Sequence, residues 1–315
     1  MAGRSKKLKL EVPSLGTTPT KSLVFPTFVR IGDPLGECIE VEETGWGAFG
    51  SVYQVKNIDG RIKAIKVVNA ASFESPKIQK GLIEGEIGLQ MKHPHLLSID
   101  EVWYDGSRFF FVMDLIEPLT VSIPDPALPK SLNDQKEKLV LFCQLVSAVE
   151  HLNSKGFLHR DIKVQNTGIM HGKDGNPQLV LFDFGEACEK SDHYSDCPGT
   201  VLNMAPEVVD HSEFSDHSEM WALMCYLVEL LTGKPMILHL FDGPLSSIKA
   251  VHVQLKIDEF REKKEPPIPE VFKTDKSRAG ILLLQILRRG LAIDPAERLT
   301  FPELEALLQE LLAIL

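Results

Sequence analysis

The most informative segment of the chain reads His159-Arg160-Asp161-Ile162-Lys163-Val164-Gln165-Asn166. Four specified residues at such fixed spacing are expected by chance in roughly one chain in several hundred of this length, if each makes up about 5% of residues. Three other short segments accompany it in a fixed order. They are Gly45-Trp46-Gly47-Ala48-Phe49-Gly50 and Ala64-Ile65-Lys66 upstream, and Asp183-Phe184-Gly185 downstream. The order carries the argument, because a GxGxxG alone would occur in roughly one such chain in ten.

In this order the four segments resemble those of the eukaryotic protein-kinase family, and the resemblance spans about residues 36–312. It implies a bilobal α+β fold with an antiparallel five-stranded sheet and one helix in the N-lobe, and a mainly helical C-lobe. We therefore expect an extended leader over residues 1–35, the N-lobe over 36–116 and the C-lobe over 117–315.

Residue patterns support this division of the chain. Short β-type runs are predicted at 38–43, 51–57, 61–68, 97–104 and 108–115, with Asp59-Gly60 and Asp105-Gly106 as turns between neighbouring runs. After Pro118 the apolar residues recur at helical spacing, first over 139–152. Further helices are predicted near 217–232, 248–263, 277–290 and 301–314. The leader has four prolines and supports neither a helix nor a long strand.

Composition limits the classes of function. The chain has 315 residues, of which 43% are hydrophobic, so it can bury a sizeable core. Its formal net charge of -10 argues against broad nucleic-acid binding. No apolar run approaches the ~20 residues that cross a bilayer, so we expect no membrane anchoring. The five cysteines form no CxxC pair, which favours a reducing compartment, cytoplasmic or nuclear.

The N-lobe residues predict a nucleotide site that would hold ATP. Glycines at 45, 47 and 50 would let a hairpin pass close over phosphates, since side chains would block the backbone. The resemblance places Lys66 on the α- and β-phosphates and pairs it with a helix carboxylate, for which Glu84 fits the family spacing and Glu86 is the alternative. The other adenine-side residues implied are Val52, Ala64, Met113, Asp114 and Ile116.

The same resemblance assigns the chemistry of phosphoryl transfer. Asp161 would accept the proton of the substrate hydroxyl, and Lys163 would contact the γ-phosphate as in Ser/Thr kinases. Asn166 and Asp183 would supply oxygen ligands to Mg2+. Thr200 matches the threonine that bonds the catalytic aspartate and lysine.

The segment between Asp183 and Glu207 predicts how activity is controlled. In the family that the sequence resembles, the arginine at the position of Arg160 normally binds an activation-loop phosphate. Here Asp196 stands where the phosphorylated residue often lies, so a carboxylate could replace phosphate. Competing phosphorylation sites are Ser191, Tyr194 and Ser195. Glu207 is expected to form a structural bridge with Arg298.

Several residues depart from the family pattern. Gly168 stands where the apolar floor of the adenine pocket is expected, with Ile169 as a possible substitute. Glu219 and Met224 replace the usual aspartate and glycine of one helix. Gly81, Gly85 and Gly88 share a face of the Glu84 helix, which predicts either close packing on the sheet or a loose helix that a regulatory partner, nucleotide or the leader positions.

The leading function is thus an ATP- and Mg2+-dependent protein kinase that phosphorylates serine or threonine of protein substrates. The alternative is a pseudokinase scaffold that binds nucleotide or partners without efficient turnover. A small-molecule kinase fits less well, because such relatives generally lack the segment with Thr200 and Ala205-Pro206-Glu207.

Overall fold

A computed structural model describes residues 8–9, 24–25, 29–47, 50–57, 59–69, 76–119, 132–172, 175–191, 203–241, 250–263 and 265–315. The chain divides into two compact units. The first contains Met1–Lys92 and Leu97–Ile116, and the second contains His93–Leu96 and Glu117–Leu315. The predicted α+β class is confirmed, with a mixed sheet in the first unit and mainly helices in the second.

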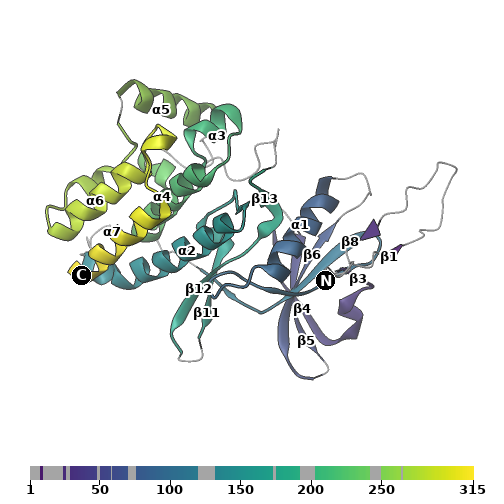
Figure 1. The fold of residues 1–315 in the computed structure, drawn as a ribbon. Coiled ribbons are helices and arrows are strands. Elements are labelled where there is room, and N and C mark those ends of the chain that lie inside the picture. The colour runs from purple at the N-terminus through teal and green to yellow at the C-terminus, as the bar shows by residue number, and fades with distance from the viewer. Residues whose placement is uncertain are drawn as a thin grey trace, which may run out of the picture. The chain divides into compact units, whose positions relative to one another are not determined.

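The first unit is built on a six-stranded sheet, several of whose strands are labelled in Figure 1. The order of its strands is β3-β7-β8-β6-β5-β4. Its strands are β3 (Val29–Ile31), β4 (Cys38–Gly47), β5 (Gly50–Asn57), β6 (Ile62–Asn69), β7 (Ile99–Tyr104) and β8 (Arg108–Met113). Strands β4 to β8 pair antiparallel as predicted, whereas β3 pairs parallel with β7. Residues 29–31 of the predicted leader are extended and belong to the sheet. The 3-10 helix η1 (Pro34–Glu37) follows β3.

Alternating side chains give this sheet two apolar faces. One face carries the cluster Val29, Ile99, Val102, Tyr104, Phe109 and Phe111, and the helix α1 (Pro76–Gln90) packs on it through Leu82 and Leu89. The opposite face carries Val55, Ile65, Val67 and Phe110, and Leu35 of η1 packs there. Burial on both faces explains why the central strands read as nearly continuous apolar runs.

The second unit is mainly helical (Figure 1). Its helices are α2 (Lys136–Ser154), α3 (Pro206–His211), α4 (Asp216–Thr232), α5 (Ala250–Lys263), α6 (Arg278–Gly290) and α7 (Phe301–Ile314). Helix α4 is buried along most of its length and begins at a capping box in which Ser215 and Ser218 bond each other's backbone N–H. Gly233 ends it in the left-handed conformation, φ 71°.

Short strands complete the second unit. β9 (Glu117–Pro118), β11 (Thr167–His171) and β12 (Pro177–Leu181) form a sheet in the order β12-β11-β9, and β10 (Phe157–Leu158) pairs with β13 (Cys188–Glu189). 3-10 turns lie at η2 (Leu132–Gln135), η3 (Val164–Asn166), η4 (Phe184–Glu186), η6 (Met236–His239), η8 (Glu270–Lys273) and η9 (Pro295–Glu297). In the first unit, β1 (Leu8–Lys9) pairs with β2 (Val24–Phe25).

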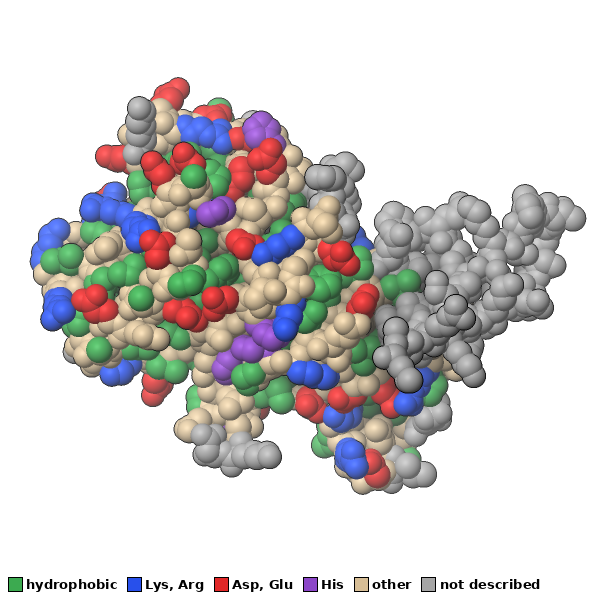
Figure 2. Space-filling model, in the orientation of Figure 1, with side chains coloured by type: hydrophobic (Ala, Val, Ile, Leu, Met, Phe, Trp, Pro, Cys, Tyr) green, Lys and Arg blue, Asp and Glu red, His purple; other side chains and the backbone are tan. Residues whose placement is uncertain are grey.

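The surface of the second unit mixes both signs of charge. Figure 2 shows acidic and basic side chains interspersed over α6 and α7, where Arg278 pairs with Glu310 and Arg289 with Glu303. Among the helices of the described residues, none combines the length and the apolar character that a membrane-spanning segment needs. Cys38, Cys143, Cys188 and Cys225 carry thiols rather than disulfides.

Candidate active site

Lys66 and Glu84 form an ion pair inside the first unit. Lys66 Nζ lies 2.6 Å from Glu84 Oε1, and the two side chains are 12% and 6% exposed. Glu86 is exposed on the same helix and accepts a hydrogen bond from Gln90 instead. Of the two carboxylates that the sequence left open, Glu84 is therefore the one that faces the lysine.

Two of the three glycines of α1, Gly81 and Gly88, pack closely against the sheet. A Cβ atom on Gly81 would lie 2.8 Å from Cδ2 of Phe109, and one on Gly88 would lie 2.4 Å from Cδ1 of Ile99. Both distances are shorter than real carbon contacts. Side chains at these positions would thus push the helix off the sheet.

The backbone at Gly50 can be made only by glycine. Its φ is 148°, and a Cβ there would lie 1.9 Å from the carbonyl oxygen of Val67. Gly45 and Gly47 lie on the adjoining strand, paired with Val52 and Gly50. The hairpin formed by β4 and β5 therefore has the bare backbone that a phosphate-covering loop requires.

Four predicted nucleotide-side residues share one face of the sheet. Val52 is the cross-strand partner of Lys66, and Ala64 is that of Met113. Because directly paired residues point the same way and residues i and i+2 share a face, these four side chains lie on one side. Asp114 and Ile116 follow at the end of β8.

Asp114 is held against the sheet by Lys63, whose side chain lies on the opposite face of the sheet from these four residues. Lys63 Nζ lies 2.6 Å from Asp114 Oδ1 and 2.8 Å from Asp100 Oδ2. This three-residue network fixes the backbone directly after β8.

In the second unit, Asp161 lies within a network of the residues predicted beside it. Its Oδ2 accepts hydrogen bonds from Lys163 Nζ at 2.6 Å and from Asn166 Nδ2 at 3.0 Å. The Asn166 amide also donates to the Asp161 carbonyl oxygen at 2.8 Å. The turn η3 brings the three residues together, and Asp161 is only 4% exposed.

Asp183 lies next to Asn166 because the hairpin of β11 and β12 joins them. Asn166 directly precedes β11, and Phe182, just after β12, donates its backbone N–H to the Asn166 carbonyl oxygen at 3.0 Å. Asp183 has φ 67°, a left-handed conformation that is uncommon outside glycine. The two expected metal ligands thus stand on adjacent segments.

His159 is the buried centre of this region. Its ring packs edge-on against Phe184, 5.7 Å between centroids, and its Nε2 donates to the Phe182 carbonyl oxygen at 3.2 Å. Its Nδ1 accepts the backbone N–H of Asp161 at 3.3 Å. Burial lowers the pKa of His159, more than the carboxylates of Asp161 and Asp183 raise it, so the ring stays neutral.

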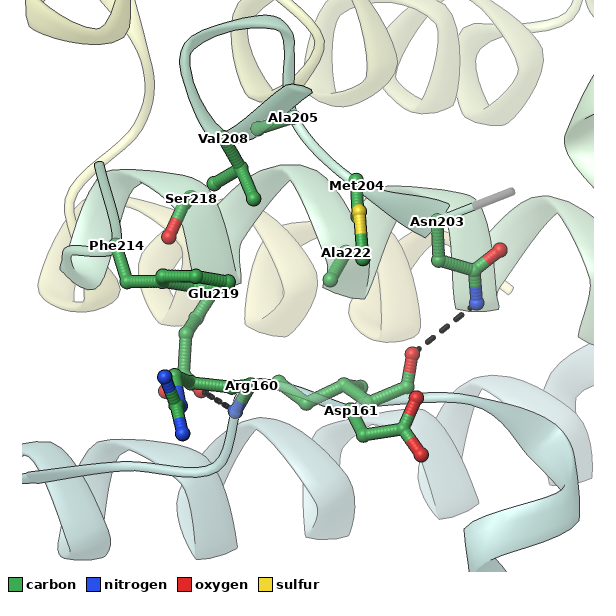
Figure 3. Close-up of a pocket in the computed structure, with 11 residues that line it drawn as sticks. Arg160, Asp161, Asn203, Met204, Ala205, Val208, Phe214, Ser218, Glu219 and Ala222 are labelled. Atoms are coloured by element: carbon green, nitrogen blue, oxygen red, sulfur yellow. Dashed lines mark hydrogen bonds between the residues drawn. The ribbon is translucent and has the colours of Figure 1, made fainter. Parts of the chain in front are cut away.

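Glu219 holds the backbone before Asp161 (Figure 3). Its Oε1 accepts the N–H groups of His159 at 2.6 Å and Arg160 at 2.9 Å. With the Asn153 amide oriented so that both its ends are satisfied, Asn153 donates to Glu219 Oε2 at 2.7 Å. The longer arm of glutamate therefore still performs the backbone contact expected of the usual aspartate.

Arg160 and Phe214 line the same pocket, with Ala205, Val208 and Ser218 on its other side (Figure 3). Arg160 Nε donates to the Glu186 carbonyl oxygen at 2.6 Å, and the guanidinium lies 5.0 Å from the centre of the Phe214 ring. Arg160 is 8% exposed. Its predicted phosphate or Asp196 contact falls on residues 192–202, which lie outside the described residues, as do Thr200, Tyr194 and Ser195.

Glu207 and Arg298 form the predicted bridge. Arg298 Nη1 and Nη2 donate to the two carboxylate oxygens at 2.7 and 2.8 Å. The guanidinium also bonds the carbonyl oxygens of His217 and Ala292 and stacks over Trp221. Arg298 is fully buried and the Glu207 side chain is 11% exposed, and this bidentate pair joins α3 to the loop before α7.

Two departures from the family pattern are accommodated by neighbouring residues. Met224 is fully buried, and a Cβ on Gly290 would lie 2.4 Å from its Cγ, so Gly290 makes the room that Met224 occupies. Gly88 makes room for Ile99 in the same way. By contrast, Ile169 pairs with the buried Leu179 and so points to the face opposite Gly168, which it cannot replace.

Comparison with known proteins now gives the family. The protein kinase domain family matches residues 39–310. The chain belongs to the protein kinase family. It is 30% identical over 207 residues to the serine/threonine-protein kinase Nek1 of Mus musculus, which covers 65% of this chain and 17% of Nek1.

Two other kinases are similar over more of the chain. The cell cycle serine/threonine-protein kinase CDC5/MSD2 of Saccharomyces cerevisiae is 28% identical over 272 residues, 82% of this chain and 34% of that protein. Mitogen-activated protein kinase kinase kinase 1 of Arabidopsis thaliana is 29% identical over 269 residues, 82% of this chain and 40% of that protein. The kinase thus spans less than half the length of these relatives.

Proposed function

We propose that this kinase transfers the γ-phosphate of ATP, with Mg2+, to serine or threonine hydroxyls of protein substrates. The observation that carries the proposal is the Asp161 carboxylate, held by Lys163 and Asn166 through the same oxygen. A carboxylate held in this way is oriented by its neighbours, so it can bind a hydroxyl and accept its proton. The named relatives, all described as protein kinases, agree with this substrate class.

The side-chain oxygens of Asn166 and Asp183 suit Mg2+. Asn166 and Asp183 offer an amide oxygen and a carboxylate, the ligands that Mg2+ takes together with phosphate and water. Within the described residues, no group of three or more His, Cys, Asp or Glu could hold a metal. The ion would neutralise charge on the phosphates during transfer.

The residues would divide the work as follows. Lys66, kept in place by Glu84, binds the α- and β-phosphates. Asp161 accepts the proton as the substrate oxygen bonds to the γ-phosphorus and the bond to the bridging oxygen breaks, releasing ADP. Lys163 offsets charge on Asp161 and on the phosphoryl group. Thr200 would contact Asp161 and Lys163 from the substrate side.

Phosphate transfer to a generic basic protein tests the proposal. Wild type should label the protein with radioactive phosphate, and Asp183→Asn and Asp161→Asn should reduce labelling by about 10³-fold or more, because each removes a charge that acts in the transition state. Glu86→Gln, an exposed change on the helix of Glu84, should leave labelling unchanged. Equal labelling by wild type and Asp183→Asn would refute the assignment.

The pseudokinase alternative rests on Gly168, which has no side chain to serve as the adenine floor. It predicts nucleotide-dependent thermal stabilisation without any labelling of substrate. Wild type that is stabilised by ATP and Mg2+ but labels nothing, while Lys66→Met abolishes the stabilisation, would establish that alternative.

A further inference from the structure

Strand β3 adds to the five strands that the sequence predicted. Val29, Arg30 and Ile31 pair in parallel with Val102, Trp103 and Tyr104 of β7. The pairing continues one residue further, where Gly32 donates its N–H to the Tyr104 carbonyl oxygen at 3.0 Å. The segment thus has a defined register on the sheet.

Polar contacts are made by the central residue of this strand and by Asp33, two residues after it. Arg30 Nη1 lies 2.9 Å from Glu101 Oε1 and its guanidinium lies over the Trp103 ring. Asp33 Oδ2 lies 3.1 Å from Arg108 Nη2. These pairs are largely exposed, so they set the register more than they add stability.

Val29 is the buried apolar residue of β3. Val29 is 7% exposed and belongs to the cluster on which Leu82 and Leu89 of α1 pack, whereas Ile31 is 41% exposed. The strand therefore adds a buried side chain to the cluster on which α1 packs.

Helix α1 has little freedom to adjust if that surface changes. Gly81 and Gly88 bring its backbone into direct contact with Phe109 and Ile99 of the same cluster. Glu84 lies between these two glycines and reaches Lys66 at 2.6 Å. Loss of one apolar member of the cluster should shift or loosen the helix and lengthen this ion pair.

We propose that β3 is a positioning strand for α1, and that Val29 acts through the helix to keep Glu84 within reach of Lys66. The effect of Val29 on phosphoryl transfer rests on the function proposed above. The effect of Val29 on α1 and on the ion pair does not depend on that function, so the two effects can be tested separately.

The first test measures the full chain without nucleotide. Val29→Ala and Val29→Asp are compared with Ile31→Ala, which makes a similar truncation at an exposed position of the same strand. Amide exchange over residues 76–90 should accelerate about tenfold or more in the Val29 variants, while exchange over 278–290 stays unchanged. Equal exchange over α1 in Val29→Ala and Ile31→Ala would overturn the proposal.

The second test follows the lysine itself. An amine-acylating reagent with peptide mass spectrometry should modify Lys66 several-fold faster in Val29→Ala than in wild type, with Lys56 as the internal reference because its side chain is 38% exposed. Val29→Ile should retain the wild-type rate. An unchanged Lys66 rate in Val29→Ala would contradict the proposal even if the helix exchanges faster.

Activity then connects the strand to function. If the kinase labels substrate, Val29→Ala should lower kcat/KM for ATP several-fold while Ile31→Ala does not. If wild type labels nothing, the proposed function fails, but exchange and acylation still decide whether β3 positions α1.

Discussion

One oxygen of Glu219 accepts the backbone N–H groups of both His159 and Arg160, at 2.6 and 2.9 Å. Arg160 has φ 64°, a left-handed backbone that costs energy in a non-glycine residue. The two hydrogen bonds offset that cost directly before Asp161. A buried carboxylate on α4 therefore sets the backbone from which the proposed catalytic base projects.

This arrangement predicts a pH dependence of stability. Burial raises the pKa of Glu219 from 4.5 to about 7, with bonds from the Arg160 and His159 backbone opposing the rise. Between pH 4.5 and about 7 the folded state binds more protons than the unfolded state. The free energy of unfolding therefore falls as pH rises, and this loss is complete above about pH 7. Glu219→Gln should remove this loss, which is on the order of 3 kcal/mol at most.

Urea unfolding of wild type and Glu219→Gln at a series of pH values from about 4 to 8 checks this prediction. Glu86→Gln, an exposed carboxyl, is the control and should keep the wild-type slope. Parallel curves for wild type and Glu219→Gln would show that the carboxyl does not titrate in this range.

His93 should give a pH dependence of the opposite sign. Its ring stacks on His151 at 5.0 Å and lies 5.5 Å from His95, and burial followed by these neighbours lowers the pKa of His93 to about 4. The unfolded histidine takes up a proton first, so stability is lost as pH falls from about 6.5 through about 4. His93→Asn should flatten this loss in acid unfolding curves, whereas His171→Asn, at an exposed residue, should not.

The bridge between Glu207 and Arg298 should be structural. Arg298→Met leaves a buried carboxylate without its partner, which typically costs about 3–5 kcal/mol. Thermal and urea unfolding should show this loss, and the charge-free pair Glu207→Gln with Arg298→Met should recover part of it. Arg278→Met, which breaks an exposed pair with Glu310, should cost less than about 1 kcal/mol.

Gly88→Ala should destabilise the protein although alanine favours helices. The new methyl would meet Ile99, whose Cδ1, Cγ1 and Cβ lie within 2.9 Å of its position. We expect a loss of about 1–3 kcal/mol from overpacking, larger than the gain of roughly 1 kcal/mol in helix propensity. Adding Ile99→Ala removes two of the three contacts. The free energy of unfolding of the double variant should therefore fall by less than the sum of the losses in the two single variants.

The sequence predicted most of the architecture because its signals are periodic and local. The helices expected at 301–314 and 277–290 form over Phe301–Ile314 and Arg278–Gly290, where apolar spacing and caps agree. Glu84, chosen from family spacing, is the carboxylate that pairs with Lys66. The roles assigned to Asp161, Asn166 and Asp183 remain proposals.

Other features depend on tertiary contacts that no local pattern contains. The strand β3 is three residues long, too short to show an alternating pattern, and its register comes from the edge of β7. Met224 departs from the family motif, and the glycine that accommodates it is on another helix, α6. Ile169 could not be assigned a side of its strand until the pairing with Leu179 was known.

The parallel pairing of β3 has a consequence for solution behaviour. Along the pairing it covers the outer edge of β7, whose unpaired peptide groups would otherwise be a template for another chain. Preparations in which β3 detaches should therefore self-associate as protein concentration rises. Detachment of β3 would then cause both the aggregation and the loosening of α1.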